Sequence, residues 1–293
     1  MEFLPFLLNG LVLGGIYAMV AIGFSIIFTT TRTFHFAHGA IYLWVGYTIY
    51  FLVEALRWSL WVAVPVSAVV AVALGTGIEH FIYRPLRARG ATSLALFVAA
   101  LGLLIFLQNL ISALFGSQAQ PVQLPDLGPP LILGDAAVTR VGILQVAMAL
   151  VLLLLAQALL RWTTLGRSLR AVASNKEMAT VIGVSVRHVY LQAFALGSLA
   201  IVPAALLNSS TTGLDPGLGG TIMLMTMVSV IVGGVGSVTG AALGGFLIGT
   251  IQGLSVWVLP VAWQSGVAFA VLMVFIVWRP TGILGAKLWQ TGV

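Results

Sequence analysis

Few residues of this chain have types and spacings that could support chemistry. His35 and His38 stand three positions apart, so on a helix they would share one face and could suggest a metal site. The chain has 4 histidines in all and no cysteine, whereas a zinc site normally needs three or four protein ligands. We therefore predict that the two histidines pack and hydrogen-bond, and that the chain holds no metal ion.

An acid and base pair is suggested by Glu79 and His80, but they lie just before the basic turn at Arg84, where polar side chains can reach water. No set of residues has the nucleophile, base and orienting group that catalysis needs. The phosphate-binding pattern G-x-x-x-x-G-K-[ST] is also absent, since the only lysines are Lys176 and Lys287. We therefore expect no enzyme activity and no bound cofactor in this chain.

The elements that carry these residues must lie in a membrane. Hydrophobic residues make up 60% of the 293 positions, and the mean hydropathy is +1.11. A helix needs about 20 apolar residues to cross the bilayer. The nine windows of this kind are 6–28, 36–56, 59–82, 91–115, 141–162, 190–209, 221–235, 238–258 and 262–278, with the second and seventh the least secure. The sequence predicts an all-α integral membrane protein, a polytopic bundle of about 8–10 transmembrane helices, some short or broken, forming one domain over residues 1–293.

Basic residues are distributed unevenly about these windows. If the amino terminus lies outside, Arg57 and Arg140 fall outside and all other Lys and Arg fall inside, so the positive-inside rule favours this orientation, with the carboxy terminus inside. The net charge of +6 then reflects topology, and we expect no nucleic-acid partner. Residues 117–140, with Asp126 and Asp135, become an external loop, either a connector or a contact for an external partner.

Two apolar windows contain clusters of glycine at similar spacings. Residues 10–25 (GLVLGGIYAMVAIGFS) and 240–255 (GAALGGFLIGTIQGLS) agree at six of sixteen positions. In the predicted topology the two copies run in opposite directions, as in the inverted repeats of transporters. Chance agreement is the alternative, since glycine and leucine are common here.

The most polar stretch between apolar windows is the segment 163–189, which includes GRSLRAVASNKEMATVIGVSVRHV. A charged residue in hydrocarbon costs roughly 3 kcal/mol, so we place this segment in the cytoplasm. Ser174 and Glu177 have the spacing of a capping box, and Gly183 can end a helix, so we expect a helix of about two turns over 174–183. Ser185 can cap the next helix.

A helix this short needs a surface to lie on. Met178, Val181 and Ile182 would share one apolar face. The segment is then either an interfacial linker at the lipid headgroups or a docking helix for a cytoplasmic protein.

The pattern Glu177-Met178-Ala179 followed by Gly183 has the E-A-A-x-x-x-G spacing of ABC importer permeases, with Met in the second place. The chain resembles the permease family of branched-chain amino acid ABC importers in particular. The supporting stretches are TRTFHFAHG (31–39), RPLR (84–87), GRSLRAVA (166–173), LDPGLG (214–219), VGGVGSVTGAALGG (232–245) and RPTGILG (279–285). The resemblance implies that the short helix couples to an ATPase. The coupling candidates are Arg167, Arg170, Ser174, Asn175, Lys176, Glu177, Met178, Ala179, Val181, Ile182 and Gly183.

The same resemblance implies the permease subunit of an ATP-driven importer in the cytoplasmic (inner) membrane of a prokaryote, moving branched-chain or other small hydrophobic amino acids by alternating access. Implied partners are a second related permease, identical or different, two ATPase subunits that use ATP and Mg, and an external solute-binding protein. His35 replaces the family's usual Asn, and Ala40 a common acidic residue. Urea, short amides and aromatic or carboxylic acids therefore stay open as substrates, and an ATP-independent secondary transporter or channel is the alternative of another class.

Polar residues and glycines within the apolar windows are candidates for the translocation path or its gate. They are His35, His38, Gln108, Asn109, Asn208, Ser209, Thr211, Gly233, Gly234 and Gly236. Interhelical hydrogen bonds are the favoured role of Gln108 and Asn109, and ordinary loop chemistry is an alternative for the polar run at 208–212. The glycines are candidate hinges.

Overall fold

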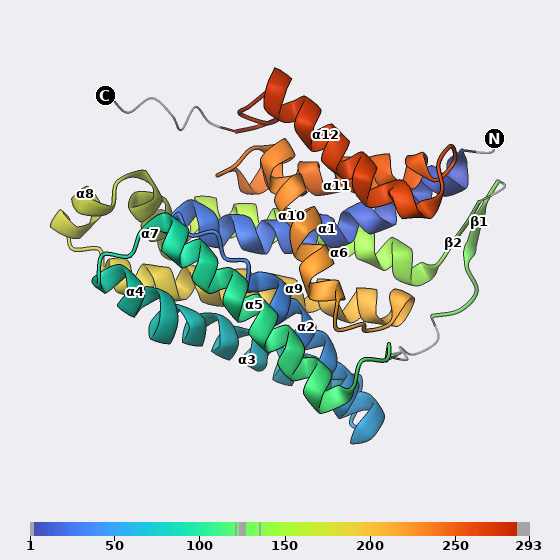
Figure 1. Ribbon diagram of the computed structural model, residues 1–293, viewed down its shortest axis with the longest axis horizontal. Coiled ribbons are helices and arrows are strands. Elements are labelled where there is room, and N and C mark those ends of the chain that lie inside the picture. The colour runs from blue at the N-terminus through green and yellow to red at the C-terminus, as the bar shows by residue number, and fades with distance from the viewer. Residues whose placement is uncertain (1–2, 121, 123–126, 135, 286–293) are drawn as a thin grey trace. The chain divides into compact units, whose positions relative to one another are not determined.

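The computed structural model describes residues 3–120, 122, 127–134 and 136–285, so Asp126, Asp135 and Lys287 lie outside it. In chain order the elements are α1 (Leu4–Thr31), α2 (His38–Tyr50), the π-helical turn η1 (Phe51–Ala55), α3 (Leu60–Ile78), the π-helical turn η2 (Glu79–Tyr83), α4 (Arg84–Ala88), α5 (Ser93–Phe115), β1 (Leu131–Leu133), β2 (Ala136–Val138), α6 (Arg140–Trp162), α7 (Thr164–Ser174), α8 (Lys176–Val181), α9 (Val186–Thr212), α10 (Leu218–Gly233), α11 (Val238–Ser255), the 3-10 turn η3 (Val261–Trp263) and α12 (Gln264–Trp278) (Figure 1).

Seven of the described helical segments are long and apolar enough to cross a membrane. They are Leu4–Thr31, Leu60–Ala88, Ser93–Phe115, Arg140–Trp162, Val186–Thr212, Val238–Ser255 and Val261–Trp278. The second and seventh windows of the sequence analysis give shorter helices, α2 with 13 residues and α10 with 16. The predicted all-α polytopic bundle with some short helices is confirmed, and the antiparallel pair β1 and β2 lies within the segment predicted as an external loop.

The chain forms two compact units. Unit 1 comprises residues 1–25, 125–155 and 224–293, and unit 2 comprises residues 26–124 and 156–223. Three of the four boundaries fall within α1, α6 and α10, so these helices contribute to both units.

Glycine brings the backbones of α1 and α11 together within unit 1. The pairs run antiparallel at four-residue spacing: Gly10 with Gly253, Gly14 with Gly249, and Ala18 with Gly245. A Cβ atom on Gly14 would lie only 2.8 Å from the Cα of Phe246, so no larger residue fits without a shift. Small residues at four-residue spacing permit this contact between membrane helices, where lipid gives no hydrophobic drive for association.

The glycines of this contact bear on the suspected repeat. Gly10, Gly14, Gly245 and Gly253 belong both to the matching positions of the two copies and to their mutual contact. Close packing alone therefore gives a reason for part of the sequence agreement. A repeat of common descent stays a prediction.

The short helix α2 lies at the centre of unit 2, packed against α3, α5 and α9. The polar tips of its aromatic residues find partners on neighbouring segments. Trp44 donates to the carbonyl of Leu107 at 3.3 Å, and Tyr47 donates to the carbonyl of Leu214 at 3.1 Å. Such bonds let large amphipathic rings be buried without an unpaired donor.

The α1 and α11 contact predicts a difference between two glycine-to-alanine variants. Gly249→Ala should lower the free energy of unfolding by about 1–3 kcal/mol, because the added methyl meets the backbone of Gly14. Gly102→Ala in α5 is the matched control, since its methyl meets nothing within 4 Å. The control should keep or raise stability, because alanine favours helix by about 1 kcal/mol over glycine. Thermal unfolding of the detergent-purified chain measures both, and equal midpoints would contradict the contact.

Candidate functional site

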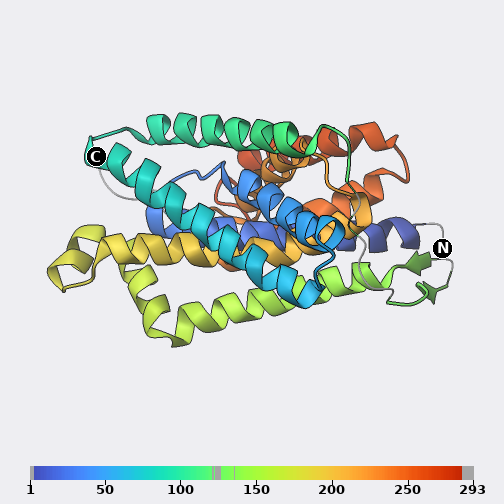
Figure 2. The ribbon, with the colours of Figure 1, turned by 90° about the horizontal axis from the view of Figure 1, so that it is seen from below.

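The segment 163–189, here called the elbow segment, folds as two short helices and a turn that lead into α9. Thr163 begins α7, with its hydroxyl accepting from the amide of Gly166 at 2.9 Å. Gly166 is buried against the backbone of Leu159 and Leu160, so α6 and α7 meet in a tight bend. Figure 2 shows α8 at the tip of α9, with α7 between α8 and this bend.

The capping-box prediction for Ser174 is wrong. Ser174 is the last residue of α7, and Asn175 stands between the helices in an extended conformation. The side-chain oxygen of Asn175 accepts from the amide of Met178 at 2.9 Å and so caps α8. Because α7 continues through Ser174, α8 covers Lys176–Val181 rather than 174–183.

The prediction that Gly183 ends the helix is confirmed. Gly183 has a φ of +87°, which a residue with a side chain rarely adopts. Its amide donates to the carbonyl of Thr180 at 3.0 Å, and the amide of Val184 donates to that of Ala179 at 2.9 Å. This pair of bonds is the Schellman motif. Ser185 begins α9 without a capping bond, since its hydroxyl instead lies 2.9 Å from Nδ1 of His188.

One side of α8 is anchored in the elbow segment. Ala179 is 2% exposed and is the buried residue of this helix. It belongs to a cluster of buried residues from α7, α8 and α9: Leu169, Val172, Ala179, Val189, Tyr190 and Ala193. The six residues of α8 are thus fixed by a cap, a Schellman motif and one packed methyl group.

The apolar residues of α8 face away from the chain. Met178 is 58% exposed, Val181 78% and Ile182 70%. The short length of α8 predicts that these side chains lie on a surface, and within unit 2 they do not. Arg167, Arg170, Lys176 and Glu177 are exposed as well, so the elbow segment presents an apolar patch with charged neighbours.

Contacts join the elbow segment to other helices of unit 2. Arg32, directly after α1, donates from Nη2 to the carbonyl of Ala173 at 3.3 Å. The guanidinium carbon of Arg87 in α4 lies 4.8 Å from the ring centre of Tyr190, and Arg87 pairs with Glu79. Sequence reasoning missed both links, because no local pattern joins residues so far apart in the chain.

The two histidines are buried in unit 2, and the predicted packing is confirmed for both. Nδ1 of His35 lies 2.9 Å from the hydroxyl of Tyr83, and its ring centre lies 4.9 Å from that of Phe194. His38 is also fully buried, with its ring centre 5.6 Å from that of His35. Among the residues that the structure describes, no group of three or more histidine and carboxylate side chains is placed to hold a metal ion.

The other polar candidates are spread through unit 2. Asn208 donates to the hydroxyl of Tyr42 at 2.7 Å. Ser209 is buried, and its hydroxyl donates to the carbonyl of Leu206. Asn109 is exposed and donates to the carbonyl of Ile105 on its own helix. The prediction of an interhelical hydrogen bond for Asn109 is therefore wrong.

Two further path candidates are less enclosed. Gln108 is half-buried near Gly220, and Thr211 is exposed and donates to the carbonyl of Asn208 at 3.0 Å. Whether any of these residues lines a substrate path stays a prediction.

The three hinge candidates form the turn between α10 and α11 in unit 1. Gly234 and Gly236 have φ values of +114° and +91°, so glycine is required there. Gly233 accepts from the amide of Leu284 at 2.9 Å, and Gly234 packs on the backbone of Gly285. The segment after α12 therefore holds this turn in place, a contact that the sequence analysis did not foresee.

Comparison with known proteins places these features in a family. Residues 6–277 match the family model described as "Branched-chain amino acid transport system / permease component". The chain is 31% identical to the high-affinity branched-chain amino acid transport system permease protein BraD of Pseudomonas aeruginosa, over 97% of this chain and 96% of that protein. It is also 31% identical to the permease protein LivH of Escherichia coli K12, over the same shares.

A solved structure described as PsaBC from Streptococcus pneumoniae in complex with Fab has a similar fold. The TM-score is 0.50 and the sequence identity 14%, with 94% of this chain and 92% of that chain covered. At this identity the similarity concerns the fold alone.

The corrected cap predicts how α8 responds to two neighbouring variants. Asn175→Ala should speed amide hydrogen exchange across residues 176–181 by about fivefold, since a lost N-cap costs about 1 kcal/mol. Ser174→Ala should leave the exchange unchanged, because Ser174 ends α7 and does not cap α8. Hydrogen exchange with mass spectrometry on the purified chain distinguishes them, and the reverse pattern would restore the capping box.

Proposed function

The chain belongs to the family of permease components of branched-chain amino acid transport systems, and from this membership we propose that it is the membrane subunit of an ATP-driven importer of branched-chain amino acids. Its own part is to form the path through the membrane. ATP with Mg is hydrolysed by two ATPase subunits, a second related permease completes the path, and an external binding protein delivers the solute.

The exposed apolar face of α8 is the observation that carries this proposal. Met178, Val181 and Ile182 occupy positions i, i+3 and i+4, the spacing with which an amphipathic helix enters a groove. Fully burying one such side chain contributes about 1.5–3 kcal/mol. A groove of the ATPase that covers all three would hold α8 firmly.

The anchored side of α8 allows a movement of the ATPase to reach the membrane helices. Ala179 and the Schellman motif join α8 to α9, and Arg32 joins α7 to the end of α1. A displacement of α8 therefore displaces the ends of two long helices. Closure of the ATPase subunits then favours one of two states of the permease, so the substrate path opens on one side at a time.

The proposed orientation places the elbow segment in the cytoplasm, the amino terminus outside and the whole chain in the cytoplasmic membrane of a prokaryote. Arg32, Arg87 and Lys176, all assigned to the inside by charge, line one pocket of unit 2, which supports this orientation. Leucine, isoleucine and valine are the substrates of choice because the relatives are named for branched-chain amino acids.

The docking surface predicts the effect of replacing Met178, Val181 and Ile182 with serine together. Co-purification of the ATPase subunits with the permease should fall at least about tenfold, while the amount of membrane-inserted chain is unchanged. The control variant carries serine in place of Val258 and Val261, which are 76% and 62% exposed at the proposed external end. The ATPase subunits should co-purify with this control as they do with the unaltered chain. Equal recovery from both variants would refute docking through α8, and an interfacial role at lipid headgroups would then be favoured.

Transport itself is tested in proteoliposomes that contain the permease, its ATPase subunits and its binding protein. ATP should drive uptake of labelled leucine, isoleucine or valine, and Glu177→Ala should reduce the uptake several-fold because Glu177 borders the docking face. Glu54→Ala removes a carboxylate from the other end of the membrane region and is the control. Uptake driven by an ion gradient without ATPase would instead identify a secondary transporter.

A further inference from the structure

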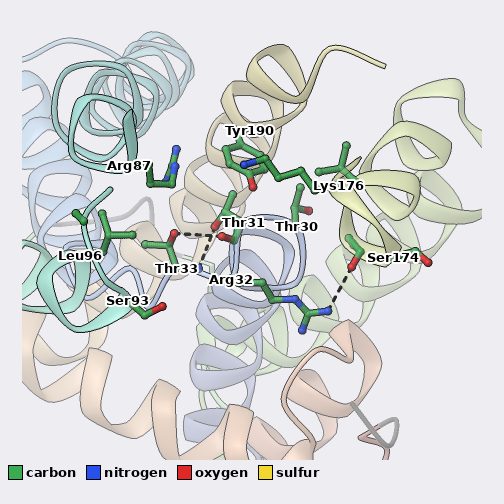
Figure 3. A pocket seen from close by; sticks show the side chains of 13 residues that line it. Thr30, Thr31, Arg32, Thr33, Arg87, Ser93, Leu96, Ser174, Lys176 and Tyr190 are labelled. Atoms are coloured by element: carbon green, nitrogen blue, oxygen red, sulfur yellow. Dashed lines mark hydrogen bonds between the residues drawn. The ribbon is translucent and has the colours of Figure 1, made fainter. Parts of the chain in front are cut away.

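A pocket of about 430 Å³ lies beside the elbow segment in unit 2. Its lining comes from the end of α1 and the residues after it, from α4, from the start of α5, from the junction of α7 and α8, and from α9. Figure 3 shows Arg87, Tyr190 and Lys176 along one side and Thr33 and Arg32 along the other. The pocket therefore brings together three regions of the chain that are distant in sequence, residues 30–33, 87–96 and 172–190.

The lining carries positive charge and no acidic side chain, although Arg87 is paired with Glu79 outside the lining. Arg32, Arg87 and Lys176 are among the 13 lining residues, and no Asp or Glu is. Thr33, Ser93 and Ser174 add hydroxyl groups. Three cations around one small space repel one another, so an anion that enters it is attracted by all three.

Arg87 is held in a fixed position with a donor to spare. Its Nη2 pairs with Glu79, a carboxylate that does not line the pocket, and its guanidinium lies over the ring of Tyr190. Its Nη1 is buried and has no hydrogen-bond partner among the described residues. A buried guanidinium nitrogen without a partner is costly, so a small rotation of the Arg87 side chain that brings Nη1 to an anion in the pocket would be favourable.

Arg32 is held at the opposite wall. It follows the last residue of α1 with a φ of +54°, a left-handed conformation that glycine or asparagine adopts more readily than arginine. One of its nitrogens donates to the carbonyl of Ala173. The guanidinium has further donors beyond this bond, so it can contact an anion while it stays joined to α7.

We propose that this pocket binds a phosphate-bearing anion through Arg32, Arg87 and Lys176. A phosphate group offers several oxygens to donors that arrive from different directions, and arginine forks match its geometry. A single carboxylate has one charge and two oxygens, which leaves part of this donor set unused. The phosphate comes either from the headgroup of an anionic lipid or from a soluble compound, because both carry the same group.

The bound anion acts on the position of α8. Lys176 is the first residue of α8, whereas Arg32 and Arg87 belong to segments on other sides of the pocket. An anion between them draws the start of α8 towards α1 and α4 and restrains the elbow segment. This consequence rests on the proposed coupling role of α8, whereas the binding itself does not.

Binding is measured on the purified permease without ATPase, so its failure is distinct from a failure of ATPase docking. In the lipid arm, native mass spectrometry compares retention of phosphatidylglycerol with that of phosphatidylcholine. In the soluble arm, inorganic phosphate is titrated into the chain in neutral detergent and the unfolding temperature is followed. Preferred retention of phosphatidylglycerol identifies the lipid source, and a saturable rise in unfolding temperature identifies the soluble one.

In the arm that responds, Lys176→Gln and Arg32→Asn should each weaken binding about tenfold, because each removes one charged contact. Asparagine tolerates the left-handed backbone at position 32, and Lys176 is exposed, so both variants should fold. Lys176→Arg should keep binding, and Arg89→Gln, an exposed basic residue outside the lining, should have no effect.

Binding should also slow hydrogen exchange across residues 176–184, since the anion restrains α8. The proposal is overturned if neither phosphatidylglycerol nor phosphate binds. It is equally overturned if Arg89→Gln weakens binding as much as Lys176→Gln, because the attraction would then be that of the basic surface in general.

Discussion

A polar group in the hydrocarbon of a membrane has no water to bond, and this constraint shapes the whole chain. Hydroxyl groups within the helices donate to the carbonyl one turn earlier: Thr30 to Ile26 at 3.0 Å, Ser67 to Ala63 at 2.6 Å and Ser229 to Met225 at 2.8 Å. Glu79, which is buried, is paired with Arg87. Charges that cannot be satisfied in this way must leave the membrane, so the elbow segment gathers Arg167, Arg170, Lys176 and Glu177. Because this segment must lie in water, it is available to a water-soluble partner.

The lipid also removes the usual hydrophobic drive for helices to associate, since lipid tails are as apolar as leucine side chains. Backbone contact takes its place in unit 1, where Gly14 of α1 meets Gly249 of α11. In unit 2, Gly75 of α3 is packed in a similar way against Ser198 of α9. Glycine is unfavourable within a helix in water, yet here it permits dispersion contacts over about two turns of two helices. The abundance of glycine in the apolar windows is therefore a packing requirement before it is a sign of hinges.

Hydropathy predicted the places of the long apolar helices because the length of a crossing is fixed by the thickness of the bilayer, but two of its nine windows gave helices shorter than a full crossing. The ends of short helices were harder to predict. Ser174 and Asn175 are both good caps, and the burial of Leu169 and Val172 extends α7 far enough to make Asn175 the residue that caps α8. Asn109 turned to its own backbone rather than to a neighbouring helix, a choice that depends on which face of α5 is covered. Contacts such as Arg32 with Ala173, 141 positions apart, have no local signature, so the pocket they border was invisible in the sequence.

The short length of α8 bears on the coupling role that we propose for it. An isolated helix of six residues is unstable in water, since helices shorter than about 12 residues are marginal even for favourable sequences. The helix persists because the cap at Asn175, the turn at Gly183 and the burial of Ala179 tie it to α7 and α9. A partner that binds Met178 and Ile182 therefore cannot unwind α8 without disrupting the buried cluster around Ala179. Such a partner would move α7 and the start of α9 together with α8. Tyr190 lies in that cluster and also beneath Arg87, and Arg32 bonds to α7, so in the proposed coupling role a displacement of α8 reaches α4 and the end of α1. The contacts that this short helix needs in order to fold are thus the same contacts that connect it rigidly to α7 and α9.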